Sequence, residues 1–224
     1  MKTLDTFLPK AVIFDMDGLM LDTENMTIPH WETAGNLFGY KITKDIVLRT
    51  VGISSIEAKN VFLKEFGMDF PYKEIQEEFR SLMKKEIEAT GVQKKKGLDY
   101  LLESLTTAGI PFGVATSSSR ATAFYMLEKA GIIEKFTAIT GGDEVKNGKP
   151  SPDIFLLAAK KLGFSPSVCV GFEDSTAGLR GLHAAGIRSI FIKDIIEPPQ
   201  EVLDTVWHKL DDLSQAVQLL ELNK

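Results

Sequence analysis

Residues 10–18 have the sequence KAVIFDMDG, in which a short apolar run meets two aspartates and a glycine. An apolar run that stops at acidic residues is typical of a strand buried on both faces of a parallel sheet. Comparable runs recur at residues 111–115, 136–140, 168–171 and 188–192. The sequence therefore predicts at least five strands.

Segments with the apolar spacing of a helix separate these runs from residue 98 onward. They cover residues 98–107, 121–130, 153–162 and 175–185. Each is followed by a glycine, which commonly closes a helix in the left-handed conformation. This alternation of strand and helix calls for right-handed crossovers, and it predicts an α/β fold with a doubly wound parallel sheet.

The alternation is absent between the first strand and residue 98. Helical patterns cover residues 26–38, 56–66 and 74–88, with no buried strand between them. An inserted α-helical cap domain explains this interruption. We place the cap at residues 23–91 and the core domain at residues 1–22 and 92–224, with hinges near residues 21–23 and 90–97.

The composition restricts the classes of function. The chain has 224 residues, of which 44% are hydrophobic, as in an ordinary globular protein. A formal net charge of −5 argues against a broad nucleic-acid-binding surface. We find no secretory signal and no apolar stretch long enough to span a membrane. A single cysteine, Cys169, excludes an internal disulfide. We expect a cytoplasmic monomer with neither nucleic-acid nor membrane partners.

Polar residues follow several of the predicted strands. The clusters are DMDG at residues 15–18, TSS at residues 116–118 and EDS at residues 173–175, and Lys149 precedes the helix at 153–162. Functional groups of such sheets lie beyond the carboxyl ends of the strands. We therefore expect these clusters to meet at one edge of the sheet.

These residue types suit the transfer of a phosphoryl group, which needs a nucleophile, cations and a proton donor. Asp15 and Asp17, two positions apart, can converge on one reacting atom as the strand ends. Gly18 allows the chain to turn and to expose backbone N–H groups to phosphate oxygens. The Thr116 hydroxyl and the Ser117 N–H can bind the same phosphate at the start of a helix.

The acids need a cation beside them, because clustered carboxylates would otherwise repel a phosphate. Ligands that are all oxygen favour magnesium over zinc. Lys149 can hold both Asp15 and a transferring phosphoryl group. Taken singly, each motif also has a structural explanation, since Asp, Ser and Thr cap turns and helices and a lysine is commonly solvated.

In this chain order the motifs resemble those of the haloacid dehalogenase superfamily, in its phosphatase and phosphomutase branch with a helical cap. The motifs are Asp15-x-Asp17-Gly18, Asp22-Thr23-Glu24, Thr116-Ser117, Lys149-Pro150 and Glu173-Asp174-Ser175. The resemblance implies that Asp15 forms an aspartyl-phosphate and that Asp17 is the acid/base catalyst. It also implies a magnesium ion held by Asp15, the Asp17 carbonyl and Asp174, with Glu173 in support.

Asp17 argues against a dehalogenase, which has no leaving-group oxygen to protonate. β-Phosphoglucomutase is the closest competitor within the superfamily. Those mutases carry a His where this chain has Thr27, and a Lys-Gly-x-Ser-Arg loop where it has VGISS at residues 51–55. The groups that would hold a second phosphate are missing, so we expect water to accept the phosphoryl group.

We therefore expect a Mg²⁺-dependent phosphatase that hydrolyses a small phosphorylated metabolite, either a sugar phosphate or a nucleotide-type monoester. Glu24 and Arg49 are the residues that we expect to meet the substrate from the cap. A phosphoglucomutase and a non-catalytic protein that binds a phosphometabolite are the alternatives.

Overall fold

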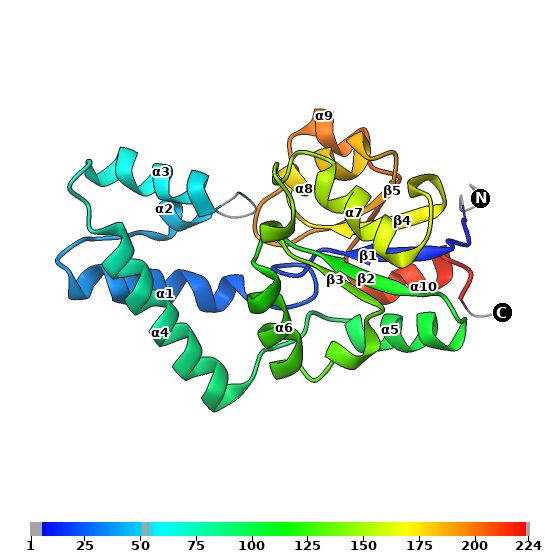
Figure 1. Ribbon diagram of the computed structural model, residues 1–224, viewed down its shortest axis with the longest axis horizontal. Coiled ribbons are helices and arrows are strands. Elements are labelled where there is room, and N and C mark those ends of the chain that lie inside the picture. Colours follow the sequence, from blue (N-terminus) through cyan, green and yellow to red (C-terminus); the bar gives the residue numbers. More distant parts are fainter. Residues whose placement is uncertain (1–5, 51–52, 54, 223–224) are drawn as a thin grey trace.

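The computed structural model describes residues 6–50, 53 and 55–222. Figure 1 shows a helical body, built from residues 24–90, beside a larger body with a central sheet. We call the helical body the cap and the larger body the core. The chain enters and leaves the cap at adjacent points of the core.

The core contains one sheet of parallel strands in the order β3-β2-β1-β4-β5-β6. The strands are β1 (Ala11–Phe14), β2 (Phe112–Ala115), β3 (Ala138–Thr140), β4 (Cys169–Glu173), β5 (Arg188–Ile192) and β6 (His208–Leu210). All four residues of β1 are fully buried, as its apolar sequence predicts. Val12 and Phe14 pack on one face of the sheet and Ala11 and Ile13 on the other.

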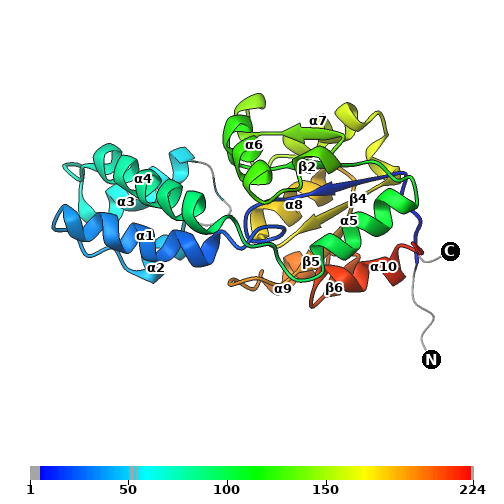
Figure 2. The ribbon, with the colours of Figure 1, turned by 90° about the horizontal axis from the view of Figure 1, so that it is seen from below.

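Helices cover both faces of this sheet. They are α5 (Leu98–Thr107), α6 (Arg120–Lys129), α7 (Asp153–Leu162), α8 (Thr176–Ala184), α9 (Gln200–Leu203) and α10 (Ala216–Leu219), with 3₁₀ turns η1 (Ile133–Lys135), η2 (Gly142–Glu144), η3 (Pro166–Val168) and η4 (Leu213–Gln215). Residues of α5, α6 and α10 share the apolar cluster that contains Phe14. Residues of α7 and α8 share the cluster that contains Ile13. Figure 2 shows α5 and α10 next to each other on their face of the sheet.

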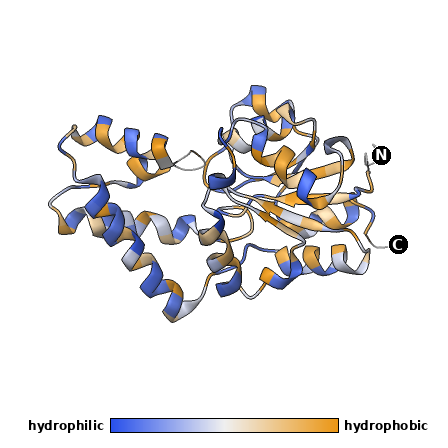
Figure 3. Ribbon diagram, viewed as in Figure 1, coloured by the Kyte–Doolittle hydropathy of each residue, from blue (hydrophilic) through white to orange (hydrophobic). Residues whose placement is uncertain are grey.

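The cap has an apolar core of its own. It contains α1 (Glu24–Leu37), α2 (Lys44–Leu48), α3 (Ser55–Phe66) and α4 (Tyr72–Thr90). The Trp31 ring stacks on Phe62 and on Phe79, with 4.6 Å between ring centroids in each pair. In Figure 3 the cap helices carry apolar and polar residues side by side, whereas the strands of the core are mostly apolar.

The two linkers between cap and core are hydrogen-bonded to each other. The Asp22 N–H donates to the Gln93 carbonyl at 2.9 Å, and the Lys95 N–H donates to the Met20 carbonyl at 2.8 Å. The Lys95 ammonium also forms an ion pair with Asp194, in the loop after β5. The two linkers are therefore held together by backbone hydrogen bonds, and the second linker is also held to the core by an ion pair.

The predicted fold class is confirmed. The predicted strands and the seven predicted helices are present, with ends that lie within two residues of the expected ones. The edge strand β6 and the short helices α2, α9 and α10 were not predicted. Within the described residues, no helix combines the length and the apolar character that crossing a bilayer requires.

Candidate active site

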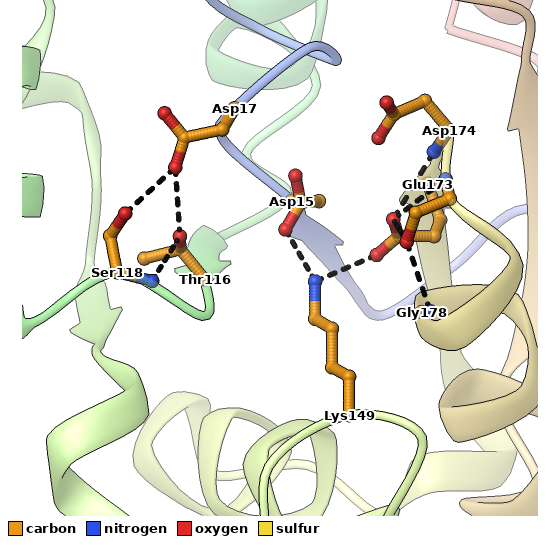
Figure 4. Close-up of polar contacts among 9 residues, drawn as sticks. Asp15, Asp17, Thr116, Ser118, Lys149, Glu173, Asp174 and Gly178 are labelled. Atoms are coloured by element: carbon orange, nitrogen blue, oxygen red, sulfur yellow. Dashed lines mark hydrogen bonds and ion pairs between the residues drawn. The ribbon is translucent and has the colours of Figure 1, made fainter. Parts of the chain in front are cut away.

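Three neighbouring strands end at the same place and bring the predicted polar clusters together (Figure 4). Asp15 follows β1, Thr116 follows β2 and Asp174 follows β4. Because β1 pairs with both β2 and β4, Asp15 lies between the other two clusters. The shared edge of the sheet thus positions residues that are far apart in the sequence.

Lys149 forms the centre of a buried ion-pair network. Its ammonium donates hydrogen bonds to Asp15 Oδ1 and, at 2.8 Å, to Glu173 Oε2. Only 4% of the Lys149 surface is exposed, which is tolerated because the charge is paired on two sides. Burial alone would lower the pKa of Lys149, but the charges of Asp15 and Glu173 raise it above its ordinary value. This lysine therefore carries its charge at every physiological pH.

Glu173 holds the lysine through one oxygen and the chain after β4 through the other. Its Oε1 accepts hydrogen bonds from the Ser175 N–H at 3.0 Å, the Ser175 hydroxyl at 2.7 Å and the Asp174 N–H at 3.3 Å. A Cβ atom at Gly178 would lie 2.0 Å from this carboxylate, so α8 can approach it only with glycine there. Both oxygens of Glu173 are thus occupied, which suits a supporting role.

Asp174 has a buried carboxylate oxygen with no partner. Its Oδ1 accepts no hydrogen bond from any described residue, and the side chain lies beside Asp15 and Glu173, with one oxygen from each acid within 4.8 Å of the others. Burial, together with the charges of Glu173 and Asp15, raises the pKa of Asp174. A hard divalent cation satisfies such oxygens, and Mg²⁺ prefers this donor set. The residues present therefore fit the magnesium ion that the sequence predicted.

Asp15 accepts a hydrogen bond from Lys149 through one oxygen, and its pKa is strongly raised. Burial raises the pKa of Asp15 to about 8, and the Glu173 and Asp17 carboxylates contribute to the rise while Lys149 opposes it. No described residue hydrogen-bonds its second oxygen, Oδ2. That oxygen is free to react with a group in the adjoining cavity.

The Asp17 carboxylate points toward the loop after β2 rather than toward Lys149 (Figure 4). It accepts hydrogen bonds from the Ser118 hydroxyl at 2.9 Å and the Thr116 hydroxyl at 3.3 Å. Burial raises its pKa, which these hydrogen bonds partly oppose. Asp15 and Asp17 line the same cavity, and their carboxylates have different hydrogen-bond partners.

Two of the predicted phosphate contacts are engaged within the protein. The Gly18 N–H donates to the Leu21 carbonyl at 3.0 Å, so this N–H is bonded within the protein, and the phosphate-binding role of the turn stays a prediction. Glycine is needed there because φ is +82° and a Cβ atom would lie 2.6 Å from the Asp174 carboxylate. The Thr116 hydroxyl is bonded to Asp17, and Ser117 lines the cavity.

The two cap residues that the sequence singled out differ in position. Glu24 begins α1, is buried and lies beside Asp174 and Asp194, and burial and Asp194 raise its pKa to about 8. Arg49 pairs with Glu65 on the cap surface and does not line the cavity. The structure brings Glu24 to the site and leaves Arg49 outside it.

A cavity of about 710 Å³ lies between cap and core, above the carboxylates. Sequence reasoning missed three residues that line it or contact its acids: Arg80, Ser118 and Tyr125. Ser118 belongs to the polar run after β2, which was a usable signal. Arg80 lies four residues from Gln76 on α4, so helical spacing places both on one face, but the sequence does not say which face meets the core.

Comparisons with known proteins agree with this architecture. A family model described as haloacid dehalogenase-like hydrolase matches residues 12–192. The phosphorylated carbohydrates phosphatase of Thermotoga maritima is 30% identical over 185 residues, 81% of this chain and 84% of the relative. The beta-phosphoglucomutase of Bacillus subtilis is 31% identical over 190 residues, 81% of this chain and 82% of the relative. A crystal structure of beta-phosphoglucomutase from Clostridium difficile, 27% identical, superposes with a TM-score of 0.78 over 93% of both chains.

Proposed function

The chain belongs to the haloacid dehalogenase-like hydrolases, and on that basis we propose that it is a magnesium-dependent phosphatase of small phosphorylated metabolites. The observation that carries the proposal is the arrangement around Asp15. Lys149 holds one oxygen of this aspartate, and no described residue hydrogen-bonds the other. Asp15 also lines a large cavity, and a buried oxygen of Asp174 that lacks a partner among the described residues lies beside it. This combination provides a nucleophile and the charges that a phosphoryl group needs.

Asp15 attacks the phosphorus atom of the substrate. A bond forms between its free oxygen and phosphorus while the bond from phosphorus to the leaving oxygen breaks, which yields an aspartyl-phosphate and an alkoxide. Lys149 stays on the opposite carboxylate oxygen and fixes the direction of attack. Attack requires the ionised form of Asp15, which the Lys149 charge favours against the opposing effect of burial.

Asp17 supplies the proton that the leaving oxygen takes up. Its raised pKa keeps it protonated more readily than an ordinary aspartate, and Ser118 and Thr116 hold its side chain over the cavity. In the second half of the reaction the same carboxylate takes a proton from water, which then releases phosphate from Asp15. One residue thus serves both half-reactions.

Asp15, Asp174 and the Asp17 carbonyl would hold the magnesium ion, with Glu173 in support. When bound, Mg²⁺ offsets the repulsion between these carboxylates and the phosphate oxygens. The unpartnered Asp174 oxygen supports this assignment, because a buried carboxylate oxygen without a partner is costly.

Hydrolysis is favoured over a mutase reaction by the contacts of Thr27 and Arg49. The Thr27 hydroxyl donates to the Thr23 carbonyl of its own helix at 2.8 Å, and Arg49 is paired with Glu65. Neither is available to hold a second phosphate. The loop at residues 51–55 also differs in sequence from that of the mutases, and its residues 51, 52 and 54 lie outside the described residues.

The test is phosphate release from p-nitrophenyl phosphate in the presence of Mg²⁺. We expect Asp15→Asn to lower the rate by roughly 10³-fold or more, because the amide is a poor nucleophile. Asp69→Asn makes the same chemical change on the exposed cap surface and serves as the control. Equal rates in the wild type and the Asp15 variant would defeat the proposal and favour a non-catalytic binding protein.

Product analysis separates the phosphatase from the mutase. With β-glucose 1-phosphate as substrate, phosphorus NMR should show inorganic phosphate alone. Glucose 6-phosphate among the products would instead assign the chain to the mutases.

A further inference from the structure

The cavity has two ends of different chemistry. The core end consists of carboxylates, hydroxyls and Lys149, which together match a phosphate and a cation. The cap end is formed by side chains of α1, α3 and α4, among them Trp31, Phe62, Phe79 and Met83. Cavities of roughly 300–1,000 Å³ bind ligands much larger than a phosphate. At about 710 Å³, this one has room for a sizeable leaving group in contact with the apolar end.

The apolar end is a wall of stacked rings. Trp31 and Phe79 are nearly parallel, with 12° between their planes and 4.6 Å between centroids, and Phe62 packs on Trp31. Phe79 and Met83 are only partly covered by protein, so part of each remains for a ligand. A leaving group rich in hydroxyls would lose its hydrogen bonds with water at this wall, whereas a flat apolar ring would not.

Two polar groups that line the cavity have no hydrogen-bond or ion-pair partner among the described residues. Arg80 on α4 lines the cavity, and none of the ion pairs or hydrogen bonds among the described residues involves it. The neighbouring Gln76 is already bonded to the Tyr72 hydroxyl at 2.9 Å. On the core side, the Tyr125 hydroxyl is buried at the cavity and has no hydrogen-bond partner in the described part of the chain.

We propose that the substrate is a phosphomonoester whose leaving group ends in a planar heteroaromatic ring, as in a nucleotide or a flavin. The ring packs against Phe79 and Met83, and acceptor atoms on its edge bind the Arg80 guanidinium and the Tyr125 hydroxyl. This substrate class rests on the proposed phosphatase function, because the phosphate of the same molecule must reach Asp15. Simple polyol phosphates should bind less well, because hydroxyls that contact the ring wall lose their hydrogen bonds with water.

Matched pairs of substrates test the ring directly. Uridine 5′-monophosphate and ribose 5-phosphate differ by the base alone, and flavin mononucleotide and ribitol 5-phosphate differ by the flavin ring alone. For at least one pair we expect kcat/KM to be about tenfold or more higher for the member with the ring. A preference of less than about threefold in both pairs overturns the proposal.

Substitutions in α4 then test which side chains produce the preference for the substrate with the ring. Arg80→Ala should lower the ratio of kcat/KM within the preferred pair by about tenfold, mainly through KM of the ring-bearing member. Lys85→Ala, an exposed cation on the same helix, is the control. Met83→Gln should lower the same ratio and Met83→Leu should preserve it, because only the first makes the wall polar. If Arg80→Ala leaves this ratio of kcat/KM unchanged, Arg80 does not bind the ring and the proposed ring site is wrong.

The two proposals fail separately. If p-nitrophenyl phosphate hydrolysis depends on Asp15 but neither pair shows a ring preference, the phosphatase function stands and the substrate class is wrong. If nothing is hydrolysed by the folded protein, both are wrong. Far-ultraviolet circular dichroism and thermal unfolding of each variant establish that it is folded.

Discussion

The core end and the cap end of the cavity differ in how firmly their side chains are held. In the core, the buried Lys149 has two buried carboxylate partners, and Glu173 has donors on both oxygens. In the cap, Arg80 has no hydrogen-bond or ion-pair partner in the described part of the chain, and Phe79 is partly exposed. The core end is therefore fixed by internal contacts before any substrate binds, whereas Arg80 and the exposed part of Phe79 remain available for contact with one.

This difference separates chemistry from selectivity. Groups that stabilise a transferring phosphoryl group act best when they are fixed in advance in a water-poor site. Cap residues that recognise a leaving group, such as Arg80, can be substituted without disturbing that arrangement, because they belong to a body with its own apolar core. Variants on the two sides of the cavity should accordingly have effects of different kinds.

The largest expected effect comes from the core. Asp17→Asn keeps a hydrogen-bond acceptor for Ser118 but cannot transfer a proton, so we expect kcat/KM, which reports the half-reaction that releases the leaving group, to fall by about 10²–10⁴-fold for an alkyl phosphomonoester. The loss should be smaller for p-nitrophenyl phosphate, whose leaving group departs without protonation. Steady-state kinetics with both substrates measures the difference. Equal losses on the two substrates would show that Asp17 is not the proton donor.

The next effect tests whether the cap is a separate cooperative unit. Phe62 is buried and stacks on Trp31, so Phe62→Ala should destabilise the cap by about 3–5 kcal/mol. Hydrogen exchange should become faster in α1 and α4 and remain unchanged in β1. The exposed Leu37→Ala is the matched control. Equal acceleration of hydrogen exchange in α1 and β1 would contradict this expectation, because cap and core would then unfold together.

Magnesium binding should depend on pH in a direction set by the core acids. Burial raises the pKa of Asp15 to about 8 and also raises that of Asp174, so the metal-free site holds protons at neutral pH. The cation binds the ionised carboxylates, and its affinity should fall as pH falls below that value, by about tenfold per pH unit for each displaced proton. Calorimetric titration between about pH 6 and about pH 8 measures this, and a constant affinity would contradict it.

The smallest effect is expected at the cap surface. Arg49 pairs with Glu65 outside the cavity, so Arg49→Ala should leave kcat/KM within about twofold and change the free energy of unfolding by less than about 1 kcal/mol. Kinetics alongside urea unfolding checks both quantities. A large increase in KM would restore the role that the sequence suggested for this residue.

Much of the core could be predicted from sequence because its signals are local. The run at residues 11–14 is apolar throughout and ends at Asp15, and parallel pairing then brings the ends of β1, β2 and β4 together. The family and the hydrolase class, both inferred from these motifs, are confirmed by the comparisons. The catalytic roles of Asp15, Asp17 and Lys149 stay predictions.

The parts that could not be predicted depend on tertiary packing. The edge strand β6 contains the partly exposed His208 and the exposed Lys209, and α2 has five residues, too few to show a helical period. For the same reason, the sequence could not show that Arg80 rather than Arg49 faces the cavity. Nor could the spacing of Asp15 and Asp17 show that Asp17 bonds to Ser118 in the loop after another strand.

Detection of a phosphoryl group on Asp15 during turnover tests the proposed mechanism most directly. Borohydride reduces an aspartyl-phosphate to homoserine, which peptide mass spectrometry locates to a residue. The Asp17→Asn variant, quenched with borohydride during turnover in Mg²⁺, should contain homoserine at position 15 alone, and only when substrate is present. Turnover without homoserine at any aspartate, or with homoserine at a different one, would contradict the assignment of Asp15 as the nucleophile.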